Sequence, residues 1–347
     1  MGFKEDSGPE IRSAYASRIL LLKSFLIDKL DYGKMPSKRF QKLALVTLIA
    51  TLLLIILGGL VRVSGAGLGC PDWPRCWGCW LPPTDISKID PGKYDVSQFN
   101  LTKMWIEYAN RMVGVVIGLL ILATFLHSIS LRKTHSRLFW ASLAALLLVI
   151  FQGWLGGEVV KSGLRPGIIT LHMVLAVGLL TLLLWIVHNS RQRPIAAPGS
   201  RRLGLVTGIL FALTCLQVVL GTQVRETVDP FIKNEGTMEA QPRSEWLSNA
   251  GSKDYAHRIL SWVVLGAAVV LVANGRKLAA GSRPRNLAHI VLALVLVQIL
   301  LGITLAYLGL PPPSQVLHLA NSALLICTEV LLLLHCYSVK QTGTPFD

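Results

Sequence analysis

The chain is poor in charged residues. Only 15% of its 347 residues are Asp, Glu, Lys or Arg, whereas soluble domains average about 25%. Hydrophobic residues make up 52% of the sequence. This deficit excludes an ordinary soluble protein and predicts an integral membrane protein.

Acidic residues are especially scarce, 19 against 34 Lys and Arg, which leaves a formal net charge of +15. A basic patch of that size would suggest nucleic acid, but the basic residues form no continuous patch. They fall in clusters between apolar runs, which is the pattern of membrane topology. Nucleic acid is therefore not an expected partner.

No cleavable signal peptide is visible at the start of the sequence. The first residues are polar, and the first apolar run of spanning length begins near Leu43. Residues 1–42 are expected to form a basic cytoplasmic arm. Its apolar and basic stretch Arg18–Leu30 is too short to cross a bilayer. This stretch is either a helix on the inner membrane surface or a disordered tail.

Eight apolar runs are long enough to span a membrane as helices. They cover residues 43–62, 106–128, 138–156, 168–188, 204–223, 257–274, 287–307 and 316–338. The connections after the second, fourth and sixth runs are rich in Lys and Arg, whereas the one after the seventh has neither. The positive-inside rule therefore predicts a multi-pass protein of the inner cell membrane with both termini in the cytoplasm. The long loops 63–105 and 224–256 then lie outside.

Several landmarks occur twice in the same order. Glu-Tyr-Ala-Asn-Arg (107–111) is matched by Asp-Tyr-Ala-His-Arg (254–258), and Leu-Gly-Gly-Leu-Val-Arg (57–62) by Leu-Gly-Thr-Gln-Val-Arg (220–225). The third pair is Gln152 followed by His172 and Gln298 followed by His318. These matches predict an all-α fold, a tandem 4+4 repeat of four-helix bundles. The repeat divides the chain into residues 43–200 and 201–340, in one orientation.

Four matched positions carry the expected chemistry. Asn110, His172, His257 and His318 each stand near the outer end of a helix that runs inward. An intramembrane histidine is either functional or bonded to a nearby carbonyl. Two imidazoles facing across a bundle are typical of haem iron ligation, which favours a haem between His257 and His318. Zinc would need four ligands, and no cysteine is near these positions in sequence.

The arginines that follow two of these positions support the haem interpretation. Arg111 and Arg258 each come directly after a site residue. Guanidinium groups pair well with the carboxylates of haem propionates. Both arginines are therefore candidate cofactor-binding residues.

Three cysteines lie in the first outer loop, Cys70, Cys76 and Cys79. Outside the cytoplasm a disulfide is the default. We favour Cys70–Cys76, with Cys76–Cys79 as the competing pair and a three-cysteine metal site as a further alternative.

Taken together, these segments resemble the haem A synthase family. The matching pieces are residues 58–74, 107–111, 152–172, 254–258 and 298–318, which extend over nearly all of the chain from 43 to 338. The resemblance implies a C-terminal half that holds haem b between His257 and His318, and an N-terminal half that binds the substrate haem O. It also implies oxidation of a methyl group of haem O to a formyl group, which gives haem A for terminal oxidases. In the family pattern Glu107 is the important acid, and Cys70 and Cys76 match the family's cysteine pair.

The chain departs from that pattern at Asn110, where the family has a histidine, and in the second outer loop, which lacks the cysteine pair of some members. An amide is a poor haem ligand, so the N-terminal site keeps His172 as its one strong candidate. Three interpretations of this site compete. In the first, it binds haem O through His172 alone, with an open position where oxygen binds. In the second, it binds substrate less tightly and reacts by a changed route. In the third, the protein is a paralogue that has lost the synthase reaction and keeps only its C-terminal haem. Glu107 is either near the haem edge as an electrostatic or proton-relay group, or a surface acid paired with Arg111.

Two other classes of function compete with the enzyme. One is a non-enzymatic membrane b-type cytochrome, and the other is a transporter, which the parallel repeat makes the weakest hypothesis. Expected partners are haem O, haem A and the lipid bilayer. A haem O synthase, terminal-oxidase assembly proteins and a second copy of the chain are candidate partners, and the sequence does not identify the electron donor.

Overall fold

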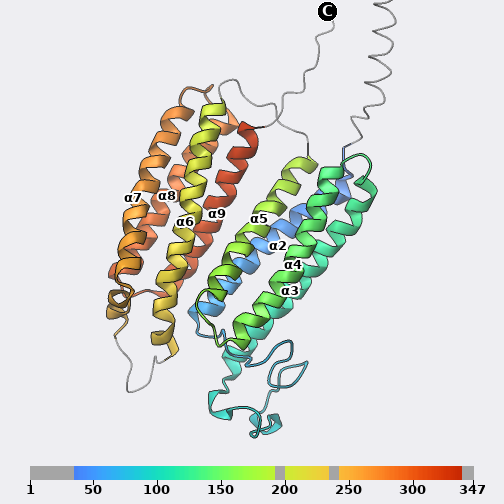
Figure 1. Cartoon of the computed structure of the whole chain (residues 1–347), viewed down its shortest axis with the longest axis vertical. Coiled ribbons are helices and arrows are strands. Elements are labelled where there is room, and N and C mark those ends of the chain that lie inside the picture. Colours follow the sequence, from blue (N-terminus) through green and yellow to red (C-terminus); the bar gives the residue numbers. More distant parts are fainter. Residues whose placement is uncertain (1–34, 192–199, 234–241, 338–347) are drawn as a thin grey trace, which may run out of the picture.

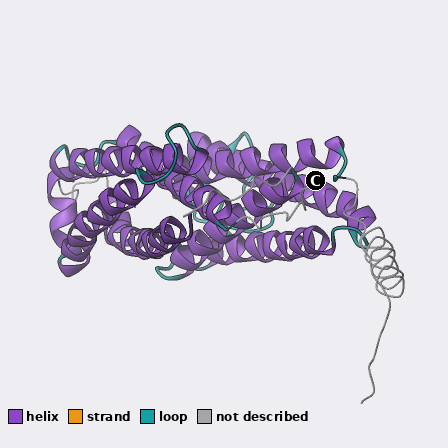
Figure 2. Cartoon of the chain, turned by 90° about the horizontal axis from the view of Figure 1, so that it is seen from above, coloured by secondary structure: helices purple, strands orange, loops and turns teal. Residues whose placement is uncertain are grey.

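The computed structural model describes residues 35–191, 200–233 and 242–337 (Figure 1). Within these ranges the long elements are all α-helices, and no strand occurs (Figure 2). They are α2 (Lys38–Val63), α3 (Leu101–Ser128), α4 (Ser136–Lys161), α5 (Ile168–Ser190), α6 (Ser200–Lys233), α7 (Ser252–Gly275), α8 (Arg283–Tyr307) and α9 (Pro312–Cys336).

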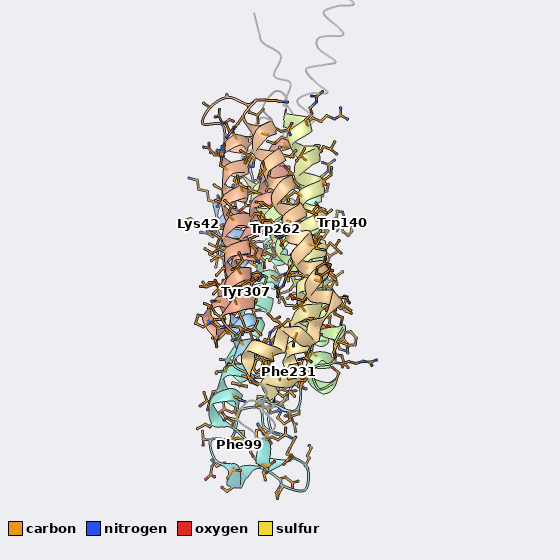
Figure 3. The ribbon with its side chains drawn as sticks, turned by 90° about the vertical axis from the view of Figure 1, so that its left-hand side faces the viewer. Lys42, Phe99, Trp140, Phe231, Trp262 and Tyr307 are labelled. Atoms are coloured by element: carbon orange, nitrogen blue, oxygen red, sulfur yellow. A yellow bond between two sulfur atoms is a disulfide. The ribbon has the colours of Figure 1, made fainter. Side chains whose placement is uncertain are left out.

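All eight of these helices are long and apolar enough to cross a membrane. The shortest, α5, has 23 residues, which corresponds to about 35 Å at the α-helical rise. Large apolar and aromatic side chains face outward along the bundle, among them Trp140, Trp262 and Tyr307 (Figure 3). A surface of this kind requires a lipid environment. The chain is thus an all-α, multi-pass membrane protein, as the sequence predicts.

The helices form two groups that lie side by side, α2–α5 and α6–α9 (Figure 1). Each group has its own apolar core, centred on residues such as Ile117 and Leu183 in one and Leu271 and Val291 in the other. The groups meet through α2, α5, α6 and α9, where a third cluster includes Leu184 and Ile326. The arrangement has the 4+4 order of the predicted repeat, while duplication itself stays a prediction.

Most helices extend a few residues beyond the predicted apolar runs, and α6 differs most. It continues to Lys233, ten residues beyond the predicted end. Its last turns carry Arg225, Glu226 and Asp229. Asp229 pairs with Arg62 of α2, Glu226 accepts a hydrogen bond from Thr170 of α5, and Arg225 pairs with Asp229 within α6. Charged residues continue a helix when their side chains are paired, so hydropathy alone places the end too early. The predicted outer loop is correspondingly shorter and contains a 3₁₀ helix, η4 (Arg243–Ala250).

The predicted cytoplasmic arm ends earlier than expected, because α2 already begins at Lys38. Ser37 caps this helix, since its hydroxyl accepts a hydrogen bond from the Phe40 amide at 3.2 Å. The stretch Arg18–Leu30 lies outside the described residues, so both interpretations of it remain predictions.

The connection between α2 and α3 is a folded loop at one end of the bundle, drawn at the bottom of Figure 1. It includes two 3₁₀ helices, η1 (Ile86–Lys88) and η2 (Val96–Gln98). A small core of Cys70, Cys76, Trp77, Ile89 and Met104 holds it together, with Phe99 packed against that core. Figure 3 labels Phe99 in this loop, beyond the ends of the helices.

Candidate functional site

Three histidines stand near the helix ends that face the folded loop, and a glutamine fixes the backbone of each. In every case the glutamine Nε2 donates a hydrogen bond to the histidine carbonyl from another helix. The pairs are Gln152 with His172 at 2.9 Å, Gln217 with His257 at 2.8 Å, and Gln298 with His318 at 3.1 Å. A carbonyl in the second turn of a helix normally has an intrahelical donor, so the extra bond holds each helix at a defined rotation.

A glycine lies against the ring of each histidine. A Cβ placed on Gly156, Gly221 or Gly302 would stand 3.5, 3.1 or 3.6 Å from the Cε1 atom of His172, His257 or His318, respectively. Glycine at these points lets the imidazole lie close to the neighbouring helix. The three histidines therefore share one local environment of glutamine and glycine.

Each of these rings keeps a nitrogen free for a ligand. Nδ1 of His172, His257 and His318 is buried and has no hydrogen-bond partner among the described residues. A buried polar atom of this kind is unfavourable unless something else satisfies it. His257 and His318 are also close enough to interact electrostatically. Two such imidazoles have the chemistry that an axial pair for haem iron requires, and the ligand assignment stays a prediction.

The fourth matched position has a different environment. When the Leu-Gly-x-x-Val-Arg ends of α2 and α6 are aligned, Leu54 stands at the place of Gln217 and Gly58 at the place of Gly221. Apart from its own helix backbone, no described atom lies within 4 Å of a Cβ on Gly58. Asn110 replaces the histidine, and its Oδ1 is buried without a hydrogen-bond partner in the described part of the chain. The histidine and its glutamine are thus both absent, and the glycine faces open space.

Glu107 is buried one turn before Asn110 on α3 and is 6% exposed. The Arg111 Nε donates to Glu107 Oε1 at 2.9 Å, so the pair predicted from the i, i+4 spacing is present. Both side chains of this ion pair are withdrawn from solvent. A surface acid would be exposed, so burial argues for more than a surface role.

Arg111 also holds the folded loop on α3. Its Nη1 donates to the carbonyls of Asp72 at 2.7 Å and Arg75 at 2.9 Å, and its Nη2 to that of Cys70 at 3.1 Å. With the bond to Glu107, these contacts occupy most of the five N–H donors of the guanidinium. Sequence reasoning assigned Arg111 to a haem propionate. The contacts give it the further task of joining Glu107 to the loop.

The loop is closed by a disulfide between Cys70 and Cys76, the pairing that the sequence favours. Cys79 stays a free thiol, although its backbone exchanges two hydrogen bonds with Cys76. Inside the loop, Asp72 accepts hydrogen bonds from the Trp77 and Gly78 amides. The disulfide and Asp72 thus stiffen the segment that Arg111 contacts.

The corresponding acid and arginine of the other half are arranged differently. Arg258 pairs with Asp254 at 2.7 Å, but its side chain is 44% exposed. This guanidinium is free of the backbone contacts that hold Arg111, within the described residues, and is accessible from outside the bundle. It suits the predicted role toward a propionate.

A set of charged residues joins the two halves near His172, and its acids, Glu226 and Asp229, were missed by the sequence analysis. Glu226 of α6 accepts hydrogen bonds from the Gly167 amide at 3.1 Å and the Thr170 hydroxyl at 2.7 Å, at the start of α5. Asp229 pairs with Arg62 of α2 at 2.6 Å and with Arg225 at 3.3 Å. The i, i+4 spacing of Arg225 and Asp229 was the available signal. The C-terminal half therefore helps to position the helix that carries His172.

Several proteins of known name are similar to this chain. The chain is similar to the heme A synthase of Shewanella oneidensis strain MR-1, with 28% identity over 315 residues that cover 82% of this chain and 93% of the relative. It is 26% identical to the heme A synthase of Methylorubrum extorquens strain PA1 over 300 residues, 76% of this chain and 78% of the relative. Identity to the heme A synthase of Wolbachia pipientis wMel is 26% over 332 residues, 86% of this chain and 92% of the relative.

The family assignment rests on a match that covers most of the chain. Residues 41–330 match the profile of the COX15-CtaA family, described as cytochrome oxidase assembly protein. The matched region runs from α2 into α9 and includes Asn110, His172, His257 and His318. The chain belongs to the COX15-CtaA family of cytochrome oxidase assembly proteins.

Proposed function

We propose that this protein is a haem A synthase, an oxidoreductase that converts haem O to haem A by oxidising a ring methyl group to a formyl group. The relatives that carry the name heme A synthase support this activity. The observation that carries the proposal is the contrast between two kinds of ligand position. His257 and His318 form a matched pair, whereas His172 has Asn110 as its counterpart.

The C-terminal half, residues 201–340, holds haem b between His257 and His318. Both rings lie against glycine, both backbones are fixed by glutamine, and both keep Nδ1 free of hydrogen bonds from the described residues. Neutral imidazoles prepared in this way are suitable axial ligands. When bound, haem b supplies one-electron transfer toward the N-terminal half. Arg258 pairs with a propionate at the outer end.

The N-terminal half, residues 43–200, binds the substrate haem O with His172 as its axial ligand. The amide of Asn110 is a weak iron ligand, and Leu54 has no group that could orient a histidine in its place. Apart from its own helix backbone, no described atom lies within 4 Å of a Cβ on Gly58, the residue that matches Gly221. These residues therefore leave one face of the substrate accessible to a small molecule such as oxygen.

Glu107 is the catalytic acid of the proposal. It stands one turn from Asn110 on α3 and is buried, so its carboxylate acts in a region of low dielectric. There it stabilises positive charge that develops at the methyl carbon, or takes up a proton. Arg111 is a positioning residue, because it fixes Glu107 against the disulfide loop.

A second candidate function is a membrane b-type cytochrome, or a synthase paralogue that has lost the reaction. The observation that favours it is the joint replacement at Asn110 and Leu54. In that case the C-terminal half would still bind haem b, while the N-terminal half would leave haem O unchanged.

Haem analysis separates these functions. The full-length protein is expressed together with a haem O synthase, purified in detergent, and its haems are extracted and identified by chromatography and mass spectrometry. Haem A or its hydroxylated precursor is the expected product. Unchanged haem O would support the cytochrome, and a protein without haem absorbance would contradict both functions.

We also propose that the protein lies in the inner cell membrane with the folded loop outside and both termini in the cytoplasm. The basic connections at the opposite end of the bundle support this orientation. Labelling of Cys79 in intact cells by a membrane-impermeant thiol reagent tests it. Labelling only after the cells are lysed would contradict it.

A further inference from the structure

A groove of about 410 Å³ opens at the end of the bundle opposite the disulfide loop. Its walls are α5 of one half and α8 of the other, and α9 lies between them. Both α5 and α8 pack on α9, whereas within the described residues they make little contact with each other. The groove therefore marks a gap in the packing between the two halves.

The mouth of the groove is basic. Arg191, which ends α5, and Arg283, which begins α8, both line it, together with Asn286. The imidazoles of His188 and His335 lie next to each other, with their centroids 5.1 Å apart. No acidic residue is found among the described residues that line the groove. Two guanidinium groups with an amide between helices favour an oxygen-rich anion, above all a phosphate.

Below this mouth the wall is apolar. It is formed by Leu184 of α5 and by Leu287 and Ile290 of α8, and Ile290 is exposed toward the surroundings of the bundle. A phosphate site that continues into an apolar wall matches a molecule with a charged head and a hydrocarbon chain. Basic pockets between helices at the cytoplasmic end commonly take anionic lipid headgroups.

The position of the groove argues against a role in haem chemistry. His335 in the groove and His318 at the candidate haem site are both on α9. Their separation of 17 residues corresponds to about 26 Å along the helix axis. The groove and the candidate haem site are therefore separate sites at different heights along α9.

We propose that this groove binds an anionic phospholipid. Arg191 and Arg283 hold the phosphate, and one acyl chain lies along Leu287 and Ile290. Because α5 and α8 belong to different halves, the lipid fills the gap between them and stabilises their association. The site is independent of the proposed synthase activity.

Lipid titration of the purified full-length protein tests the proposal. The protein is delipidated in neutral detergent, and native mass spectrometry follows the addition of phosphatidylglycerol or phosphatidylcholine with the same acyl chains. We expect one phosphatidylglycerol to bind at least tenfold more tightly than phosphatidylcholine and to raise the melting temperature. The double variant Arg191→Gln/Arg283→Gln should lose this preference.

Two further variants distinguish the groove from general surface charge and from misfolding. Lys133→Gln/Arg137→Gln removes the same charge from another connection at this end and should keep the preference. Ile290→Trp leaves both arginines in place but fills the apolar wall, and should weaken phosphatidylglycerol binding. Equal loss in the Lys133/Arg137 control would overturn the proposal. An equal rise in melting temperature with inorganic phosphate alone would show a free-anion site and also overturn it.

Discussion

The two halves of the molecule present the same four-position framework with one position altered. Three positions have a histidine, a glutamine on its carbonyl and a glycine against its ring. At the fourth, the histidine is Asn110, the glutamine is Leu54, and Gly58 faces open space. These two differences lie on two helices, α2 and α3, so the N-terminal site differs from the other three positions by more than the residue at position 110.

The acid and arginine pairs also differ between the halves, and here the N-terminal half has the more ordered pair. Glu107 and Arg111 are buried and connected to the disulfide loop, whereas Arg258 is largely exposed beside Asp254. The half with fewer iron ligands therefore has the more ordered carboxylate. This is the difference expected between a half that stores a cofactor and a half that reacts with a substrate.

The largest effect is expected from removing a ligand of the C-terminal half. His257→Ala leaves His318 alone, so the low-spin spectrum of bis-histidine haem should disappear from the purified protein. Optical and electron paramagnetic resonance spectra measure this loss. His127→Ala is the control, because His127 is exposed and lies near the C-terminal end of α3. An unaltered spectrum in His257→Ala would refute the ligand assignment.

The acids of the two halves should differ in catalytic importance. Glu107→Gln keeps the size of the side chain but removes its charge, and haem A formation should fall about 100-fold, the usual effect of removing an electrostatic catalytic group. The matched change Asp254→Asn should lower it far less. Comparable losses in both variants would mean that Glu107 has no special place in the reaction. Haem content measured in parallel separates a loss of chemistry from a loss of binding.

Restoring the histidine and the glutamine should make the N-terminal ligand site resemble that of the C-terminal half. Leu54→Gln/Asn110→His restores both the imidazole and the glutamine that fixes its helix. Bound haem O should become six-coordinate. Haem A formation should fall by at least tenfold, because the route proposed for this chain uses the open face, in contrast to the family pattern with a histidine at this position. Asn110→His alone should give a mixture of coordination states. If the double variant makes haem A at the normal rate, the open position is not required.

The smallest effects concern the arginines and stability. Arg111→Gln leaves Glu107 and three loop carbonyls without their donor, and should destabilise the protein by about 3 kcal/mol, as breaking a buried ion pair does. Arg258→Gln removes the partly exposed pair with Asp254 and should cost under about 1 kcal/mol. Thermal unfolding in detergent measures both. Equal costs would show that the contacts of Arg111 to the loop contribute little.

The eight helices could be predicted because runs of apolar residues report membrane spans directly. The end of α6 could not, since the charges of Glu226 and Asp229 are satisfied by α5 and α2, which are distant in sequence. The histidines were recognised from the repeated motifs, as were Gln152 and Gln298, but only as landmarks. The hydrogen bonds that these glutamines donate to the histidine carbonyls depend on how the packed helices are rotated about their axes. The significance of Leu54 likewise becomes apparent only when α2 is aligned with α6, because Gln217 then occupies the matching position.

The contacts of Arg111 illustrate a further limit of the sequence. Its spacing from Glu107 predicts the ion pair, while its bonds to the carbonyls of Cys70 and Asp72 depend on the path of a folded loop. Backbone carbonyls have no sequence signature. The disulfide, in contrast, was one of two open pairings and is confirmed as Cys70–Cys76.

The ligation state of haem in the wild-type protein tests the difference between the halves most directly. Protein purified from cells that make haem O is examined by electron paramagnetic resonance, with the total haem determined by extraction. We expect equal amounts of a low-spin haem with two histidines and a high-spin haem with His172 alone. Two low-spin haems, or a high-spin signal that survives His172→Ala, would contradict the account.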